Sequence, residues 1–262
     1  MIKLHTCRSI LYVSLLRQSL IFPEFKTVNC LMSILSAPRK FASYFKLVNL
    51  LQPKSRNNPV KSSQTVRNLK ISKMSKSALV IIAQGAEEME TVITVDMLRR
   101  AGVSVTMAGL DGNSPVLCSR QVTLVPDKSL ADALAEKPQY DAVILPGGLE
   151  GSDRLSKSDV VGTLLKEHEG SGKIIAAICA APTAFVAHGV GKGKKITSYP
   201  TTKEKITSDY TYIEGEKVVI DGNFVTSRGP GTAYWFGLSL IELLTDKEKA
   251  AQVEKGMIIT GY

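Results

Sequence analysis

The chain has 262 residues, a formal net charge of +9 and four cysteines, a length that fits one large domain or two small ones. The charge is uneven, because residues 1–73 hold 13 of the 33 basic residues and one acid, whereas residues 74–262 hold 20 basic and 23 acidic residues. With no zinc-finger, homeodomain or RRM motif, specific nucleic-acid recognition is not expected. The cysteines form no CxxC pair or Cys/His cluster, which argues against a metal site or a disulfide framework.

Residues 1–73 are rich in Arg, Lys, Ser, Asn and Leu and almost free of acids, the composition of an organellar transit peptide. This interpretation places the protein in mitochondria. Alternatively, Met74 is the true start and the upstream residues come from another transcript or gene model, which places the protein in the cytoplasm and possibly the nucleus. Either way we expect residues 1–73 to be disordered, and no window approaches the roughly 18 apolar residues of a membrane span.

From Ser77 onward the sequence alternates between short apolar strands and amphipathic helices. The predicted strands cover residues 78–83, 103–108, part of 116–125, 141–146 and 174–178. The predicted helices run from about 86 to 101, from about 157 to 169 and from about 245 to 253. This order favours a single α/β domain, residues 74–262, with a mostly parallel sheet covered by helices on both faces.

The first predicted helix has an apolar face and several acidic residues near its start. Its apolar positions are Met89, Val92, Ile93 and Met97. Glu90 lies in its first turns, five residues after a glycine, and is a candidate acid–base group. Its neighbours Glu87 and Glu88 are interpreted as solvated acids that the helix dipole favours.

The stretch around Cys179 has the local pattern of a nucleophile elbow. An uncharged strand, 174–178, ends in Cys179, and then come two alanines and Pro182. A sharp strand-to-helix turn at a nucleophile needs small neighbours. A thiol over a helix N-terminus is also expected to have a lowered pKa. A buried structural cysteine remains the alternative interpretation of these residues alone.

Ligands of such sheets bind beyond the carboxyl ends of the strands. Three predicted strand ends carry candidate chemistry, namely 85–90, the turn with Gly147 and Gly148, and Cys179. Paired glycines let backbone N–H groups approach a ligand and act as oxyanion donors, although a simple turn would use them too.

Four segments, 83–90, 145–148, 176–183 and 226–232, give residues 74–262 a close resemblance to the DJ-1 branch of the DJ-1/PfpI superfamily. The resemblance implies a flavodoxin-like, Rossmann-type three-layer sandwich with a nucleophile elbow, usually as a homodimer and without a cofactor. It makes Cys179 the nucleophile and Glu90 a protonated partner that donates a hydrogen bond to the thiolate. The implied oxyanion and substrate-binding residues are Gly147, Gly148, Ala180, Arg120 and Arg228.

Two positions depart from the family pattern. Many members place a histidine after the cysteine, but this chain has Ala180, so peptidase activity is not expected. The DJ-1 branch has a histidine before a proline near the thiol, where this chain has Tyr199, and an unperturbed phenol cannot act as a base near pH 7. His168 and His188 are interpreted as structural, so proton transfer is assigned to Glu90.

The preferred hypothesis is a cofactor-free glyoxalase or deglycase that acts on methylglyoxal-type 2-oxoaldehydes and their early glycation adducts. The alternative is a non-enzymatic redox sensor or chaperone in which Cys179 is oxidised to a sulfinate held by Glu90. A nucleotide-binding protein is disfavoured, because no G-x-G-x-x-G motif or P-loop lysine is present. Cys118 is predicted to be a packed or interface thiol.

Overall fold

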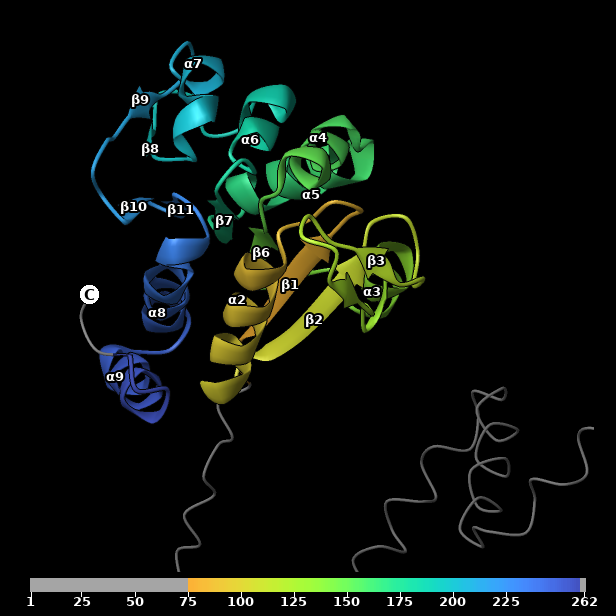
Figure 1. Cartoon of the computed structure of the whole chain (residues 1–262), viewed down its shortest axis with the longest axis vertical. Helices are drawn as coiled ribbons and strands as arrows, with labels where there is room; N and C mark the ends of the chain where they lie inside the picture. Colours follow the sequence, from red (N-terminus) through yellow and green to blue (C-terminus); the bar gives the residue numbers. More distant parts are fainter. Residues whose placement is uncertain (1–74, 260–262) are drawn as a thin grey trace, which may run out of the picture. The chain divides into compact units, whose positions relative to one another are not determined.

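The computed structural model describes residues 75–259, so the predictions for residues 1–73 lie outside the described residues. The described chain is built on a seven-stranded sheet in the order β10-β11-β7-β6-β1-β2-β5 (Figure 1). All neighbouring strands in this sheet are parallel except β10 and β11. The strands are β1 (Ser77–Ile82), β2 (Ser104–Gly109), β5 (Lys128–Ser129), β6 (Ala142–Leu145), β7 (Ile174–Ile178), β10 (Val218–Asp221) and β11 (Phe224–Ser227).

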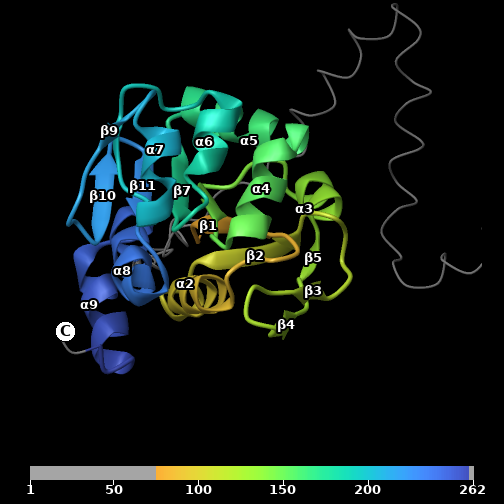
Figure 2. The same ribbon diagram turned by 45° about the horizontal axis from the view of Figure 1, so that its top comes forward.

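Helices cover both faces of the sheet, as Figure 2 shows. One face carries α2 (Glu88–Arg100), α8 (Ala233–Leu244) and α9 (Lys247–Gly256), and the other carries α3 (Leu130–Glu136), α4 (Leu149–Lys157), α5 (Asp159–Gly170) and α6 (Thr183–His188). Successive strand residues point to opposite faces. Val80 and Ile82 therefore belong to the first core, while Leu79 and Ile81 belong to the second. The predicted three-layer α/β sandwich is confirmed.

Short elements at the edge of the sandwich complete the fold. An antiparallel hairpin joins β3 (Val116–Leu117) to β4 (Thr123–Leu124), and β8 (Lys195–Ile196) pairs in parallel with β9 (Thr211–Tyr212). The remaining elements are the 3₁₀ turns η1 (Pro200–Thr202) and η2 (Pro230–Thr232) and the one-turn helix α7 (Lys203–Ile206). Within residues 75–259 no helix is long and apolar enough to cross a membrane.

The buried face of α2 differs from the prediction. Met89 and Val92 are about half exposed, whereas Val95 and Leu98 are buried and Met97 packs against Gly237 of α8. The reason is that α2 is covered by the sheet on one side and by α8 on another, so small polar residues such as Thr94 are buried as well. Two large apolar side chains are thereby left on the surface.

Helix α4 was not predicted, whereas the helix predicted at about 157–169 is α5. The sequence of α4 is polar and contains Gly151, which is unfavourable inside a helix. Gly151 is needed there because a Cβ at this position would lie 2.9 Å from the Ala86 backbone. The close approach places α4 directly against the loop that leads to Glu90.

Candidate active site

Cys179 lies on a strained elbow between β7 and α6. Its φ angle is 62°, in the left-handed region that costs a non-glycine residue roughly 1–2 kcal/mol. The Cys179 N–H donates to the Ser227 carbonyl (3.0 Å), and the Cys179 carbonyl accepts from the Tyr199 N–H (2.7 Å). Ala180 and Ala181 are almost completely buried around it. The predicted elbow is confirmed, and its strain is held by hydrogen bonds from two neighbouring segments.

Glu90 reaches the same place from the first turn of α2. Its side chain is fully buried, and Oε2 accepts a hydrogen bond from the Gly147 N–H (2.8 Å). The other oxygen, Oε1, has no partner in ordinary hydrogen-bond geometry among the described residues, but the carboxyl interacts with the neighbouring Cys179 thiol, which opposes the rise in the pKa of Glu90. Burial first, and then the charge of Glu87, raise the pKa of Glu90 to about 8, although the Gly147 bond opposes the shift. The carboxyl is therefore mostly protonated at neutral pH.

The thiol does not have the lowered pKa that the sequence predicted. Burial first, and then the charge of an ionised Glu90, raise the pKa of Cys179 to about 12. Hydrogen bonds from the Gly148 and Ala180 N–H groups oppose this rise, because they stabilise a negative sulfur. Protonation of Glu90 removes its charge and leaves these two amides facing the sulfur. The pKa of Cys179 therefore depends on whether Glu90 is protonated.

The two glycines after β6 bring the amides and the carboxyl together. Gly147 binds the Glu90 carboxyl, and the Gly148 N–H points to the sulfur of Cys179. The φ angle of Gly148 is 86°, and a Cβ there would lie 2.2 Å from the Gly85 carbonyl oxygen. Both glycines are therefore required by the geometry of the site. Both the Gly148 and Ala180 amides act on the Cys179 sulfur, so they are candidate oxyanion donors.

We expect Gly147→Ala to disable the site by direct collision. The added Cβ would lie 2.5 Å from the Cys179 Cβ and 2.6 Å from Glu90 Oε2. Overpacking of this kind costs about 1–3 kcal/mol in the free energy of unfolding. Chemical denaturation should report that loss, whereas the control Gly170→Ala, which meets nothing within 4 Å, should be neutral or stabilising. Equal stability of the two variants would contradict the close packing described for Gly147.

Two further acids in this loop are buried and hydrogen-bonded, which corrects their interpretation as solvated charges. Glu87 caps α2, because its Oε2 accepts from the Glu90 N–H (2.7 Å). Glu88 accepts from the Ser119 hydroxyl (3.0 Å) and the Arg120 N–H (2.8 Å). Both residues therefore fix the first turn of α2 and, with it, the position of Glu90.

The structure brings Cys179 and Glu90 together, but it does not place both predicted arginines beside them. The Arg120 side chain is exposed and donates to the Ser119 carbonyl (3.1 Å), and none of its described contacts is with Cys179. Arg228 is half-buried, and it follows Ser227, which binds the Cys179 backbone. The hydrogen bond from Lys203 is the first cause that lowers the pKa of Glu214, and the charge of Arg228 is the last. Arg228 therefore remains a candidate for substrate binding, whereas the structure gives Arg120 no contact with the thiol.

The two histidines have structural contacts, as predicted, and Tyr199 contacts the elbow through its backbone. His168 is buried and its Nδ1 pairs with the Leu164 carbonyl (2.9 Å), while His188 Nε2 pairs with the Leu155 carbonyl (3.0 Å). Both rings are thus structural. Tyr199 is 41% exposed, and its backbone N–H donates to the Cys179 carbonyl.

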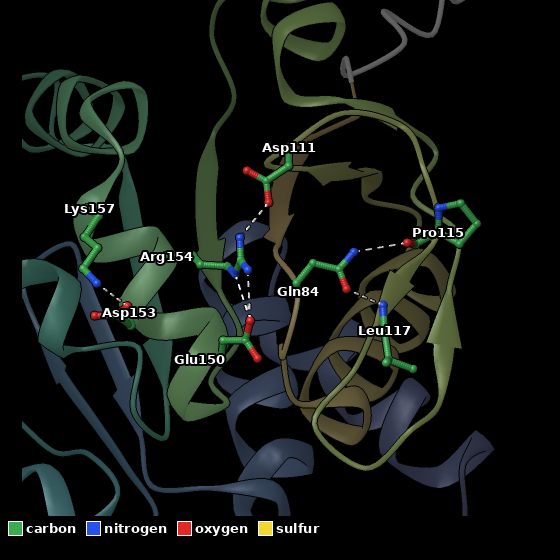
Figure 3. A network of polar contacts seen from close by, with 8 residues as sticks. All are labelled: Gln84, Asp111, Pro115, Leu117, Glu150, Asp153, Arg154 and Lys157. Atoms are coloured by element: carbon green, nitrogen blue, oxygen red, sulfur yellow. Dashed lines mark hydrogen bonds and ion pairs between the residues drawn. The ribbon is translucent and has the colours of Figure 1, made fainter.

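Polar contacts that the sequence did not indicate surround the loop after β1 and the start of α4 (Figure 3). Gln84 donates to the Pro115 carbonyl (3.2 Å) and accepts from the Leu117 N–H (2.9 Å). On the other side, Arg154 of α4 bridges Glu150 (3.0 Å) and Asp111 (3.5 Å). Cys118, in the hairpin that Gln84 anchors, is 2% exposed, and the prediction of a packed thiol is confirmed.

Fold and site together define a class of α/β sandwich proteins that carry a cysteine on an elbow beside a buried glutamate. Comparison with known proteins agrees, since residues 76–243 match the DJ-1/PfpI family. The chain belongs to this family, in its DJ-1 branch. It is 54% identical over 186 residues to protein dj-1beta of Drosophila melanogaster, which covers 71% of this chain and 98% of that protein.

Two further comparisons extend this assignment. The glutathione-independent glyoxalase DJR-1.2 of Caenorhabditis elegans is 39% identical over 186 residues, 70% of this chain and 97% of that protein. The crystal structure of Drosophila melanogaster DJ-1beta superimposes with a TM-score of 0.69 at 53% identity, and the match covers 72% of this chain and all of that one. Within residues 75–259 no group of three or more His, Cys, Asp or Glu side chains is arranged to hold a metal ion.

Proposed function

We propose that the protein is a cofactor-free glyoxalase that converts methylglyoxal-type 2-oxoaldehydes to 2-hydroxy acids and acts on their early glycation adducts. The observation that carries this proposal is that a nucleophile, an acid–base group and two amide donors lie together. They are the strained Cys179 thiol, the buried Glu90 carboxyl and the Gly148 and Ala180 amides. The similarity to a glutathione-independent glyoxalase supports the same reaction class.

The reaction begins when the sulfur of Cys179 adds to the aldehyde carbon. In molecules whose Glu90 is ionised, the thiol proton passes to this carboxylate as the S–C bond forms, and the aldehyde oxygen becomes an oxyanion. Glu90 then returns the proton to that oxygen, which gives a neutral hemithioacetal and leaves Glu90 as a carboxylate. The Gly148 and Ala180 amides face the sulfur, so an oxygen on the adjoining carbon lies within their reach. Covalent addition divides one difficult step into two easier ones.

Glu90 then moves a proton between carbon and oxygen. A carboxyl with a pKa of about 8 can both release and accept a proton near neutral pH. The Glu90 carboxylate removes the proton from the former aldehyde carbon to give an enediolate and returns it to the neighbouring carbon. The hydroxyl proton of the former aldehyde oxygen passes to the former ketone oxygen, which gives a 2-hydroxy thioester. The aldehyde carbon is oxidised and the ketone carbon is reduced, so no external oxidant is needed. Water cleaves the thioester, releases lactate and restores the thiol.

The direct test is lactate formation from methylglyoxal by the full chain, with no glutathione or other cofactor added. The proposal expects catalytic turnover that survives Cys118→Ala, because Cys118 is buried in the hairpin, where its thiol pairs with the Val116 carbonyl. Stoichiometric loss of methylglyoxal without lactate would contradict it, since simple thiol scavenging would give that result.

Oxidant sensing is the second function that an observation favours. Glu90 Oε1 is buried without a partner in ordinary hydrogen-bond geometry among the described residues, so it could hydrogen-bond an oxygen added to the sulfur. If this were the function, mild peroxide would add two oxygens to Cys179, and lactate formation would not exceed that of Cys179→Ala. Lactate turnover by the reduced protein would instead favour the enzyme.

We also propose that the protein is a homodimer that buries the apolar side chains left exposed on α2 and the β3–β4 hairpin. These surfaces adjoin, because Glu88 of α2 binds Ser119 of the hairpin. Their exposed apolar residues are Met89, Val92, Leu117, Val122 and Val125. A patch of this kind is expected to be covered by a partner.

The dimer proposal predicts that Val92→Glu gives a monomer, because an unpaired carboxylate would be buried in the interface. Light scattering coupled to size exclusion measures the change. Val160→Glu is the matched control, since Val160 is equally exposed but lies on α5, and it should leave the dimer intact. A wild-type monomer, or a Val92→Glu dimer, would contradict the assignment of this surface.

A further inference from the structure

Glu87, Glu90 and Gly147 are joined by a closed ring of hydrogen bonds. The Glu87 carboxyl accepts from the Glu90 N–H (2.7 Å), and the Glu90 carboxyl accepts from the Gly147 N–H (2.8 Å). The Gly147 carbonyl in turn accepts from the Glu87 N–H (3.0 Å). The ring therefore ties the start of α2 to the end of β6, and it places two carboxyl groups side by side in the chain of contacts.

The ring lies inside the protein. Glu90 is fully buried and Glu87 is 9% exposed. Thr91, which is also fully buried, donates to the Glu87 carbonyl through its hydroxyl (2.8 Å) and its N–H (3.2 Å). A Cβ at Gly148 would lie 2.9 Å from the Glu87 nitrogen, so this candidate oxyanion donor packs directly on the ring. Solvent screens buried charges only weakly, so a charge on Glu87 acts strongly on Glu90.

The two carboxyl groups of the ring have different surroundings. Burial first raises the pKa of Glu87, and the charge of Glu88 adds to the rise, but two backbone N–H groups and the charge of Arg120 oppose it. Glu90 is more deeply buried and has one backbone donor, the N–H of Gly147. Glu87 therefore ionises first as the pH rises, and its negative charge then opposes the ionisation of Glu90.

The other titratable or charged side chains around the ring do not replace Glu87. They are Glu88, Cys118, Arg120, Glu150 and Cys179. The two thiols are neutral near pH 7, because burial raises the pKa of Cys118 to about 11 and that of Cys179 to about 12. Glu88 is bound to the Ser119 hydroxyl, and Glu150, which lies against Gly85, is paired with Arg154. Among these acids, Glu87 is the one whose charge acts on Glu90.

We propose that Glu87 is a positioning residue for the reaction, because its hydrogen bonds hold Glu90 against Gly147 and its negative charge keeps most Glu90 carboxyls protonated at neutral pH. A protonated Glu90 carries no charge, so it leaves the amide donors facing the sulfur unopposed. Glu87 thus sets the pH at which Glu90 becomes a base, although none of its described contacts is with Cys179. The link to turnover rests on the glyoxalase function, whereas the effect on the Glu90 proton does not.

The pH at which Glu90 titrates tests the inference directly. Carboxyl ¹³C NMR of the full chain follows the glutamates, and the Glu90 signal is the one that Glu90→Gln removes. In the wild type we expect its midpoint at about pH 8. Glu87→Gln keeps an acceptor for the Glu90 N–H but removes the charge, so it should lower the midpoint by about one pH unit.

The matched control is Glu88→Gln, which removes a similarly buried charge from the same turn of α2. It should leave the Glu90 midpoint within about 0.3 of a pH unit. An unchanged midpoint in Glu87→Gln, or an equal fall in Glu88→Gln, would overturn the inference. The wild type alone gives a further test, since its Glu87 carboxyl, assigned through the backbone, should titrate at a lower pH than Glu90. The reverse order would also overturn the inference.

Turnover provides a readout that a purely structural role would not move. The reaction begins with an ionised Glu90, so kcat/KM for methylglyoxal should rise with pH through the same midpoint. At about pH 6, Glu87→Gln should exceed the wild type by about three- to tenfold, because more Glu90 is ionised while its weaker basicity offsets part of the gain. If Glu87 only held the fold, its substitution would lower kcat/KM at every pH, and that result would contradict the proposed role.

The two readouts separate failure of this inference from failure of the glyoxalase function. A lower Glu90 midpoint in Glu87→Gln, without lactate formation by the wild type, would uphold the role of Glu87 and reject the glyoxalase. Lactate formation by the wild type, with the same Glu90 midpoint in Glu87→Gln, would reject the role of Glu87 alone.

Discussion

Cys179→Ala is expected to lower kcat/KM for methylglyoxal on the order of 10³-fold or more, because the covalent step has no other nucleophile at the site. The two buried neighbours, Glu90 and the paired amides, cannot form a bond to the aldehyde carbon. The fold should be unaffected, since alanine fits the 8% exposed position and removes one atom. Thermal denaturation of the variant checks this point beside the lactate assay.

The serine variant sharpens the same prediction. Cys179→Ser retains a hydroxyl in the place of the thiol, but a hydroxyl is a much weaker nucleophile at neutral pH. We expect its turnover to be close to that of Cys179→Ala. Substantial activity in either variant would show that the sulfur does not form the bond to substrate, and the proposed reaction would have to be abandoned.

Glu90→Gln is expected to lower turnover by about 10²–10⁴-fold, because the amide keeps the shape of the carboxyl but cannot carry a proton. The introduced amide can still accept the Gly147 hydrogen bond through its oxygen, so the loop should keep its position. The effect should fall on the proton-transfer step and not on binding. A variant with wild-type lactate formation would contradict the assignment of Glu90.

The raised pKa of Glu90 predicts that the free energy of unfolding of the wild type depends on pH. The native protein raises the pKa of Glu90 from 4.5 to about 8, so it holds a proton that the unfolded chain releases in this range. The stabilisation that comes from this bound proton is complete below pH 4.5. It decreases steadily as the pH rises and is lost once the pH has passed about 8. Relative to Glu90→Gln, the wild type should therefore lose up to about 4–5 kcal/mol of unfolding free energy between pH 4.5 and 8. Urea denaturation at several pH values measures the difference.

The parts of the site that depend on strand ends could be predicted from the sequence. Buried parallel strands are uncharged apolar runs, so β1, β6 and β7 and the residues that follow them are recognisable in the chain. The carboxyl ends of parallel strands meet at one edge of the sheet, and this rule alone predicts that Gly147 and Cys179 lie together. Glu90 was found in the same way, from its place soon after β1.

The errors concern features that depend on neighbours distant in the sequence. Met89 and Val92 look like a buried face, but α8 covers another side of α2. Glu87 and Glu88 look solvated, but their partners lie in the α2 backbone and in the hairpin. Helix α4 has a polar sequence because it packs through Gly151 and small residues. Except for the Glu87 cap, whose Glu90 N–H partner is three residues away, these contacts leave no local pattern.

The thiol pKa was mispredicted for a related reason. The pattern around Cys179 shows a turn into a helix, which favours a thiolate. It does not show how deeply the sulfur is buried, and this burial is the first cause that raises the pKa of Cys179; the charge of Glu90 adds to it only in the fraction of molecules whose Glu90 is ionised. The sequence could therefore identify the reacting groups, while the balance between them required the three-dimensional arrangement.

The central claim is that Cys179 forms the bond and Glu90 moves the proton, and Glu90→Gln separates the two events. The measurement is carbon NMR of methylglyoxal labelled with ¹³C at the aldehyde carbon, mixed with Glu90→Gln and with Glu90→Gln/Cys179→Ala. We predict a protein-bound hemithioacetal signal in the single variant, no such signal in the double variant, and almost no lactate in either. Lactate formed by Glu90→Gln at the wild-type rate, or a bound signal that persists without Cys179, would contradict the mechanism.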